Sequence, residues 1–252
     1  MVHEKAGQPE AAEEAYNQSL SINVRLGNQA GQGGTLIHLG NLYNYYLKRP
    51  EEAVACYQRA AEIYCEIGNV ASEGKALSGL ALTFLKLQRF DESRVCIKRV
   101  IQSTKSSGHE VEPWKFWSIL TNIEIAAGNS AVAADARHQA INAFLAYRRD
   151  GGENQSGSGG LALAVRQLLA SGGDPAEAAS SLQQFAADPR AAGMLPFLTT
   201  LQAITAGSRD RSLAEDPALD FDEAAEVLLL IEALEAEVGD ESRAWPGRFN
   251  EA

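Results

Sequence analysis

Residue types that could perform acid–base or metal chemistry occur in this chain, but their spacing matches no catalytic site. The segment Gly31-Gln32-Gly33-Gly34 fails the dinucleotide-binding fingerprint, because Leu36 occupies the last glycine position and no strand is expected before it. The acidic pair Glu51–Glu52 lies in the first turn of an expected helix, where carboxylates complement the helix dipole. The four histidines show no metal-ligand spacing: His3, His38, His109 and His138. We therefore expect no enzyme active site, no cofactor and no bound metal.

The charge and hydropathy patterns limit the partners of the chain. The formal net charge is −11 over 252 residues, and the acidic residues are spread without a basic tail or stripe. Nucleic acids and anionic membranes both attract clustered Lys and Arg, so we expect neither as a partner. No apolar run approaches the ~20 residues that span a bilayer, and the N-terminus has no signal-peptide core. Cys56, Cys65 and Cys96 have no paired spacing and are expected to be reduced, mostly buried thiols in a cytoplasmic protein.

A phrase of the sequence recurs at a nearly constant interval. The segment from Pro9 to Tyr16 returns from Pro50 to Tyr57 and, more loosely, from Phe90 to Ile97. The steps from Tyr16 to Tyr57 and from Gly68 to Gly108 both span roughly 40 residues. A fixed period of this size predicts an array of helical hairpins, because one hairpin alone cannot bury its apolar face.

The apolar spacing predicts two helices in each repeat. Apolar side chains three and four residues apart indicate complete hairpins at 32–68, 71–107 and 113–147. Small residues recur where helices approach closely, and Gly40 and Ala81 stand one period apart. Before these three lies an incomplete first hairpin, with only Met1–Gln8 before its helix at 9–27. Together the four hairpins form a predicted array over residues 1–150.

The composition changes after this array. Residues 151–160 include five glycines and are expected to form a mobile loop or linker. Two degenerate hairpins are predicted within 161–238, pairing 161–171 with 176–187 and 191–206 with 221–238, and a tail is predicted at 239–252. The apolar face of the helix at 221–238 either docks on residues 161–206 or forms a homodimer contact.

The repeated residues resemble tetratricopeptide repeats (TPRs). The resemblance rests on Leu39-Gly40-Asn41-Leu42-Tyr43 in a first helix, and on Pro50-Glu51-Glu52-Ala53 followed by Tyr57 and Ala60 in a second helix. The standard unit has about 34 residues, and the longer period here is similar to that of kinesin light chains. The resemblance implies an all-α, right-handed superhelical solenoid of antiparallel helix hairpins. In the third hairpin Glu124 and Arg137 depart from the pattern, which predicts either an irregular hairpin or a buried Glu124–Arg137 pair.

In TPR proteins the first helices line a concave groove, so the resemblance implies a peptide-binding face. Asparagine can donate and accept main-chain hydrogen bonds, and Asn41 and Asn122 stand at equivalent positions, with Leu82 between them. The expected partner-binding residues are His38, Asn41, Asn44, Tyr45, Lys75, Leu82, Lys86, Lys115 and Asn122. Ordinary solvated polar residues are the alternative interpretation. The lysines match the carboxylate clamp of chaperone-binding TPRs only in part, and no Arg lies in the expected helix.

The sequence therefore predicts a non-enzymatic scaffold that binds a peptide or helix of another protein in the concave groove. The alternative is a sensor or regulatory arm of a larger signalling protein or enzyme, with its effector part N-terminal to Met1. The truncated first hairpin suggests this second interpretation.

Overall fold

The computed structural model describes residues 8–243, and the side chains of residues 8–236. This part of the chain contains eleven α-helices and no strand, so the predicted all-α class is confirmed. The chain divides into two compact units, Met1–Ala140 and Ile141–Ala252.

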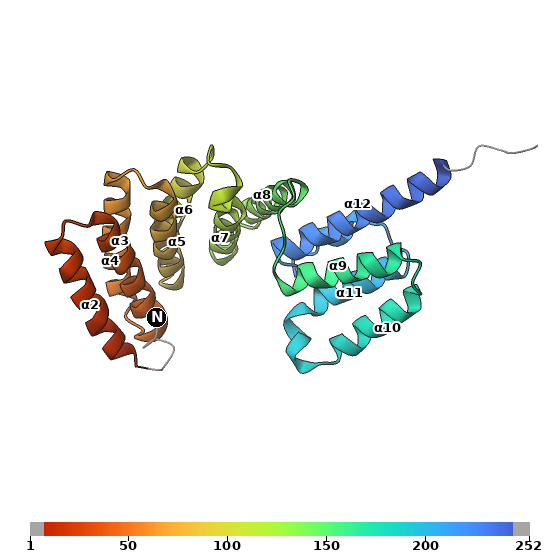
Figure 1. Ribbon diagram of the computed structural model, residues 1–252, viewed down its shortest axis with the longest axis horizontal. Helices are drawn as coiled ribbons and strands as arrows, with labels where there is room; N and C mark the ends of the chain where they lie inside the picture. Colours follow the sequence, from red (N-terminus) through yellow and green to blue (C-terminus); the bar gives the residue numbers. More distant parts are fainter. Residues whose placement is uncertain (1–7, 244–252) are drawn as a thin grey trace, which may run out of the picture. The chain divides into compact units, whose positions relative to one another are not determined.

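The first unit is a stack of helix hairpins (Figure 1). Its helices are α2 (Pro9–Arg25), α3 (Gln29–Asn41), the π-helix η1 (Leu42–Tyr46), α4 (Pro50–Glu66), α5 (Val70–Lys86), α6 (Phe90–Ser103), the 3-10 helix η2 (Gly108–Val111), α7 (Pro113–Ala126) and α8 (Ser130–Arg149), which continues past the division. Neighbouring helices along the chain pack against each other from α2 to α7. The hairpins expected from the period of the sequence are therefore the elements of this unit.

Local residue choice explains where these helices begin and end. The side chains of Asn28 and Asn69 accept hydrogen bonds from the backbone three residues on, which caps the N-termini of α3 and α5. Gly27 and Gly68 precede them with φ of 64° and 68°, a left-handed conformation that terminates the helix before. The recurring Gly-Asn pair is therefore a combined stop and start signal.

The first helices of the hairpins form one layer of the stack. Helix α3 contacts α5 directly and α5 contacts α7, whereas α2, α4 and α6 make no comparable contact with one another in the described part. In a curved stack the layer with the closer helices is the inner one. We call α3 with η1, α5 and α7 the inner layer, and α2, α4 and α6 the outer layer.

Glycines in the inner layer allow tyrosines of α4 to approach its backbone. A Cβ atom at Gly40 or Gly79 would lie 2.7 Å or 2.6 Å from the ring of Tyr57, closer than atoms can pack. A Cβ at Gly33 would lie 2.7 Å from the ring of Tyr64 in the same way. The glycine cluster that failed the dinucleotide fingerprint is therefore a packing surface.

One extra residue in the first complete hairpin is absorbed by the π-helix. Tyr43 and Phe84 are equivalent, and the guanidinium groups of Arg49 and Arg89 lie 4.6 Å and 4.4 Å from the centroids of their rings. Arg49 follows Tyr43 by six positions, but Arg89 follows Phe84 by five. The surplus residue lies in η1, whose backbone bonds reach back five residues. This hairpin is therefore one residue longer than the next.

The second unit pairs helices that are distant along the chain. It contains α9 (Gly157–Ala170), α10 (Pro175–Ala186), the 3-10 helix η3 (Pro189–Met194), α11 (Leu195–Thr205), the 3-10 helix η4 (Arg211–Glu215) and α12 (Phe221–Arg243). Helix α12 packs most extensively on α9, and α10 packs on α11, whereas α9 and α10 contact each other little. The predicted pairings 161–171 with 176–187 and 191–206 with 221–238 are therefore not the main contacts of this unit.

The apolar face of α12 is covered within its own unit. Val227, Leu230, Ile231 and Leu234 are all buried, on a helix that packs against α9 and η4. Of the two alternatives from sequence, docking on residues 161–206 is the observed one. The face suggested for a homodimer is therefore occupied by the chain itself.

The glycine-rich stretch is partly helical rather than a loop throughout. Helix α9 begins at Gly157, because the side chain of Ser156 caps it by accepting from the Gly159 amide. Ser156 and Ser158 also donate to Oδ2 of Asp222, at 2.9 Å each. These bonds offset the low helix propensity of glycine. The prediction of a loop over 151–160 is thus wrong for its last four residues.

The predicted ends of the chain agree only in part with the structure. Helix α12 runs to Arg243, so the tail predicted from residue 239 begins too early. The rest of the predicted tail, residues 244–252, and all but Gln8 of the predicted half-hairpin Met1–Gln8 lie outside the described residues.

Candidate functional site

The inner layer differs in charge from the rest of its unit. Its helices carry two carboxylates, Glu73 and Glu124, and both are buried and paired with arginines of α6. The exposed carboxylates on the α-helices of this unit lie on second helices instead: Glu10, Glu14, Glu51, Glu52, Glu62, Glu66, Asp91, Glu92 and Asp135. The inner layer therefore combines exposed lysines with no exposed helical carboxylate, in a chain of net charge −11.

The structure places the nine predicted binding residues on the inner layer, but with different accessibility. Asn41 and Leu82 are half-buried, and Asn44 is buried. The others are exposed: His38, Tyr45, Lys75, Lys86, Lys115 and Asn122. The His38 ring stacks on Tyr16, with centroids 5.5 Å apart. Eight of the nine side chains therefore reach the surface at least in part.

Asn44 cannot serve as a surface contact, contrary to the prediction. It is 2% exposed, because the π-helix turns its side chain inward. Lys86 Nζ donates to the Asn44 carbonyl at 2.8 Å and lies 3.3 Å from its Oδ1. The role of Asn44 is to hold the ammonium group of Lys86 at the junction of η1 and α5.

Asn41 is held by a neighbour from the outer layer. The hydroxyl of Tyr57 donates to Asn41 Oδ1 at 2.6 Å. Burial raises the pKa of Tyr57 above its usual value, so this hydroxyl keeps its proton and remains a donor. The amide oxygen of Asn41 is therefore occupied within the chain.

The three lysines do not converge as a carboxylate clamp would require. Lys86 is held by Asn44, and Lys115 Nζ lies 2.6 Å from a carboxylate oxygen of Glu112, just before α7. Lys75 is exposed at the N-terminal part of α5. The three charges belong to a dispersed positive surface rather than to one pocket.

Buried ion pairs connect the inner layer to α6. Glu124, 1% exposed, accepts from Arg94 Nε at 2.6 Å and Nη2 at 2.9 Å, and from Asn129 Nδ2 at 2.7 Å. The Arg94 guanidinium lowers the pKa of Glu124 below its ordinary value. The predicted pair with Arg137 is thus replaced by one with Arg94, because α6 lies directly against α7.

Sequence reasoning missed two residues that shape this surface. The sequence analysis identifies Tyr57 only as a repeated position of a second helix, although its hydroxyl reaches Asn41. Arg94 is not predicted at all, since nothing along the sequence links it to Glu124, thirty positions later. The signal available for Tyr57 was a hydroxyl group on a side chain at an otherwise apolar helix position. Identifying Arg94 required knowing that α6 packs on α7.

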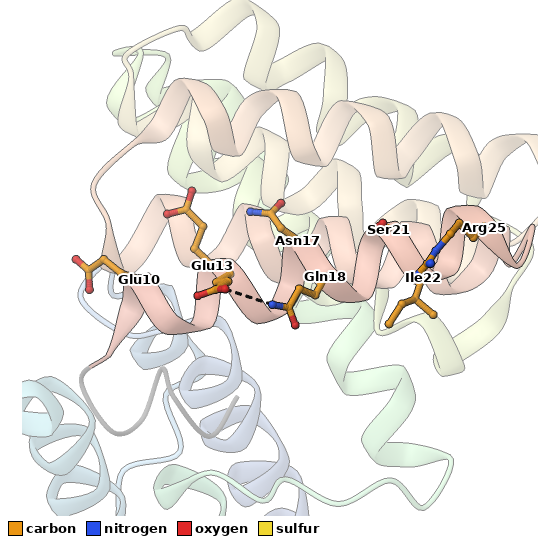
Figure 2. A pocket seen from close by; sticks show the side chains of 8 residues that line it. Glu10, Glu13, Asn17, Gln18, Ser21, Ile22 and Arg25 are labelled. Carbon is orange, nitrogen blue, oxygen red and sulfur yellow. Dashed lines mark hydrogen bonds between the residues drawn. The ribbon is translucent and has the colours of Figure 1, made fainter.

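A hollow of about 740 Å³ on α2 lacks the features of a functional site. Figure 2 shows its lining, which includes Glu10, Asn17, Ile22 and Arg25, all from this one helix. Gln18 donates to Glu14 at 3.3 Å, one turn of helix away. A single helix face brings no groups together from different elements, so nothing here converges on a ligand.

The cysteines and Trp114 lie mostly in the packed interior. Cys96 is buried and Cys56 half-buried, and burial raises the pKa of both thiols to about 11, but Cys65 is exposed. Trp114 is 5% exposed and belongs to the core. Within residues 8–243 no group of three or more potential metal ligands occurs, and no helix has the length and apolar character needed to cross a bilayer.

Comparison with known proteins agrees with this architecture. Residues 1–66 match the family model described as tetratricopeptide repeat. BtubC (BKLC) from P. vanneervenii is similar in structure with a TM-score of 0.54 and 17% identity, over 100% of this chain and 81% of that one. No curated protein matches the chain significantly in sequence.

Two crystal structures of a putative kinesin light chain with nearly identical TPR-like repeats from Podosopora anserina are also similar. One, of a single-site variant, has a TM-score of 0.54 and 15% identity, over 82% of this chain and 92% of that one. The other has a TM-score of 0.51 and 13% identity, over 94% of this chain and 92% of that one. At these identities the likeness is one of fold. Residues 1–66 therefore resemble tetratricopeptide repeats, and the chain has the fold of kinesin light chain-like repeat proteins, as the sequence predicted.

Proposed function

We propose that this chain is a non-enzymatic protein-interaction module whose inner layer binds an extended, acidic peptide segment of a partner protein. Repeats of this family generally mediate protein–protein interactions. The observation that carries the proposal is the separation of charge, since the inner-layer helices present lysines and no exposed carboxylate. Within the first unit of this acidic chain, the inner layer is then the surface that repels an acidic segment least.

Electrostatic attraction alone would give orientation rather than tight binding. Hydrogen bonds to the peptide main chain are available from the side-chain amides of Asn41 and Asn122. Tyr45, 50% exposed, and the half-buried Leu82 offer apolar contact area along the same layer. These groups together fit an extended segment with its backbone accessible.

The test begins with a random twelve-residue peptide library displayed on phage and panned on the full chain. Enriched peptides are synthesised with a fluorescent label, and their Kd is measured by fluorescence polarisation. The inner-layer variant is Lys75→Glu with Lys115→Glu. The matched control is Lys98→Glu with Lys105→Glu, which makes the same charge change on exposed residues of α6 and the turn after it.

The proposal predicts enrichment of Asp and Glu, and a loss of affinity of about tenfold or more for the inner-layer variant alone. The loss should shrink as salt concentration rises, because exposed charges are screened. Absence of any enriched peptide, or equal losses in the two variants, would contradict binding at the inner layer.

A further inference from the structure

The position of Tyr57 leaves its hydroxyl no freedom. Its side chain is 1% exposed, and its ring is enclosed by the backbones of Gly40 on α3 and Gly79 on α5. At both places even one added carbon would lie under 3 Å from the ring. The ring is therefore clamped between two hairpins, and this packing fixes the position of its hydroxyl at the edge of the inner layer.

The group at that point is the Asn41 side chain. A side-chain amide has an accepting oxygen and a donating NH2 group, and rotation by half a turn exchanges them. Because the Tyr57 hydroxyl donates to Oδ1 at 2.6 Å, the oxygen faces the core and the NH2 group faces away from it. Asn41 is half-buried, and its NH2 group has no acceptor among the described residues.

The next hairpin provides an internal comparison. The positions of Asn41 and Tyr57 are occupied there by Leu82 and Ile97. The polar pair of one hairpin is thus replaced by an apolar pair in the other, although both second members are completely buried core residues. In these two hairpins the hydroxyl is present opposite the amide and absent opposite the leucine, whereas the third hairpin has Asn122 and Arg137 at the two positions. Packing alone would be satisfied by phenylalanine at position 57.

We infer that Tyr57 is a positioning residue that presets Asn41 as a hydrogen-bond donor for a main-chain carbonyl of the partner segment. The inference rests on the proposed function and adds to it the direction of one hydrogen bond, in which Asn41 donates and the partner accepts. At this point of the inner layer the partner must present an acceptor. A segment with proline next to the contacting carbonyl is compatible, since proline lacks only the donor.

The first arm of the test needs no ligand. In the full chain, ¹⁵N relaxation gives the order parameter of the Asn41 side-chain NH2 group for the wild type and for Tyr57→Phe. The matched control is Tyr64→Phe, which removes the other buried tyrosine hydroxyl of α4, whose bond goes to the Ala30 carbonyl at 3.1 Å. We expect a rigid Asn41 amide in the wild type and in Tyr64→Phe, and a mobile one in Tyr57→Phe. Equal mobility in all three would overturn the inference.

The second arm is a double-mutant cycle, with the highest-affinity peptide from the library as the probe. Asn41→Ala should weaken binding about fivefold, the typical value of one hydrogen bond. Tyr57→Phe should weaken it by about threefold or more, and should have no further effect in the Asn41→Ala background. Tyr64→Phe should leave the Kd unchanged.

The outcomes distinguish the positioning role of Tyr57 from the proposed function. If Asn41→Ala has no effect, the assignment of the peptide to this part of the inner layer fails. If Asn41→Ala weakens binding but Tyr57→Phe does not, or if their effects add, the positioning role is wrong while the proposed function stands. If no peptide is enriched, the mobility of the Asn41 amide still decides whether Tyr57 orients it.

Discussion

Replacing Arg94 by methionine should destabilise the first unit strongly, because it leaves Glu124 buried without its cation. The carboxylate is 1% exposed and accepts two bonds from Arg94, at 2.6 Å and 2.9 Å. Breaking one side of a buried pair typically costs about 3–5 kcal/mol. The Arg94 side chain is itself 21% exposed, and Asn129 still donates to Glu124, so we expect about 3 kcal/mol at neutral pH.

The pH dependence follows from the direction of the pKa shift. Arg94 holds the folded-state pKa of Glu124 below its ordinary value. A carboxyl with a lowered folded-state pKa contributes stability above its unfolded pKa, and that contribution is lost as pH falls through the folded value. Without Arg94, burial is the main remaining influence and raises the pKa, so Glu124 takes up a proton at higher pH than in the wild type. The deficit of Arg94→Met is therefore largest near pH 7 and narrows toward pH 4.

Urea unfolding followed by tryptophan fluorescence measures this deficit, since Trp114 and Trp117 both lie on α7, the helix that carries Glu124. The matched control is Arg59→Met, which removes an exposed pair with Glu62 and should cost about 0.5 kcal/mol or less at every pH. A deficit below about 1 kcal/mol for Arg94→Met at pH 7, or one that does not change with pH, would refute the reasoning.

Three further substitutions or reactions test the packing. Gly79→Ala should lower the free energy of unfolding by about 1–3 kcal/mol in urea, because its Cβ would lie 2.6 Å from the ring of Tyr57; unchanged stability would contradict the clamp. A thiol reagent such as DTNB should modify the exposed Cys65 at least about tenfold faster than Cys96, whose pKa burial raises to about 11, and equal rates would be inconsistent with the burial. Ser156→Ala should cost about 1 kcal/mol and speed amide hydrogen exchange in the first turn of α9, whereas unaltered exchange would exclude a capping role.

The repeated part of the chain was predictable because its signals are local. The Gly-Asn pair at residues 27–28 and 68–69 marks helix ends, and each helix shows its own apolar spacing. Hairpin stacking then follows, since neighbouring helices must cover one another. The inner-layer location of residues such as Asn41 also follows from periodicity, once the family resemblance says which helices face inward.

Features that depend on contacts between distant residues were not predictable in this way. In the sequence, the only sign of the π-helix is one repeat interval that is a residue longer than the next. The burial of Asn44, which results from the π-helix, could be recognised only in the three-dimensional structure. In the second unit α12 pairs with α9 although two α-helices and two 3-10 helices lie between them along the chain, and a regular repeat does not predict such a pairing. The helical start at Gly157 depends on bonds to Asp222, which is far away along the sequence.

Binding of partner segments along the inner layer is the central claim, and site-specific photo-crosslinking tests it most directly. The crosslinker p-benzoylphenylalanine replaces Tyr45 on the inner layer or Arg59 on the outer layer, both exposed. The full chain is irradiated with the labelled peptide selected from the library, and crosslinks are located by mass spectrometry. We predict a crosslinked adduct from position 45 and none from position 59. An adduct formed from position 59 alone, or equally from both, would contradict the claim.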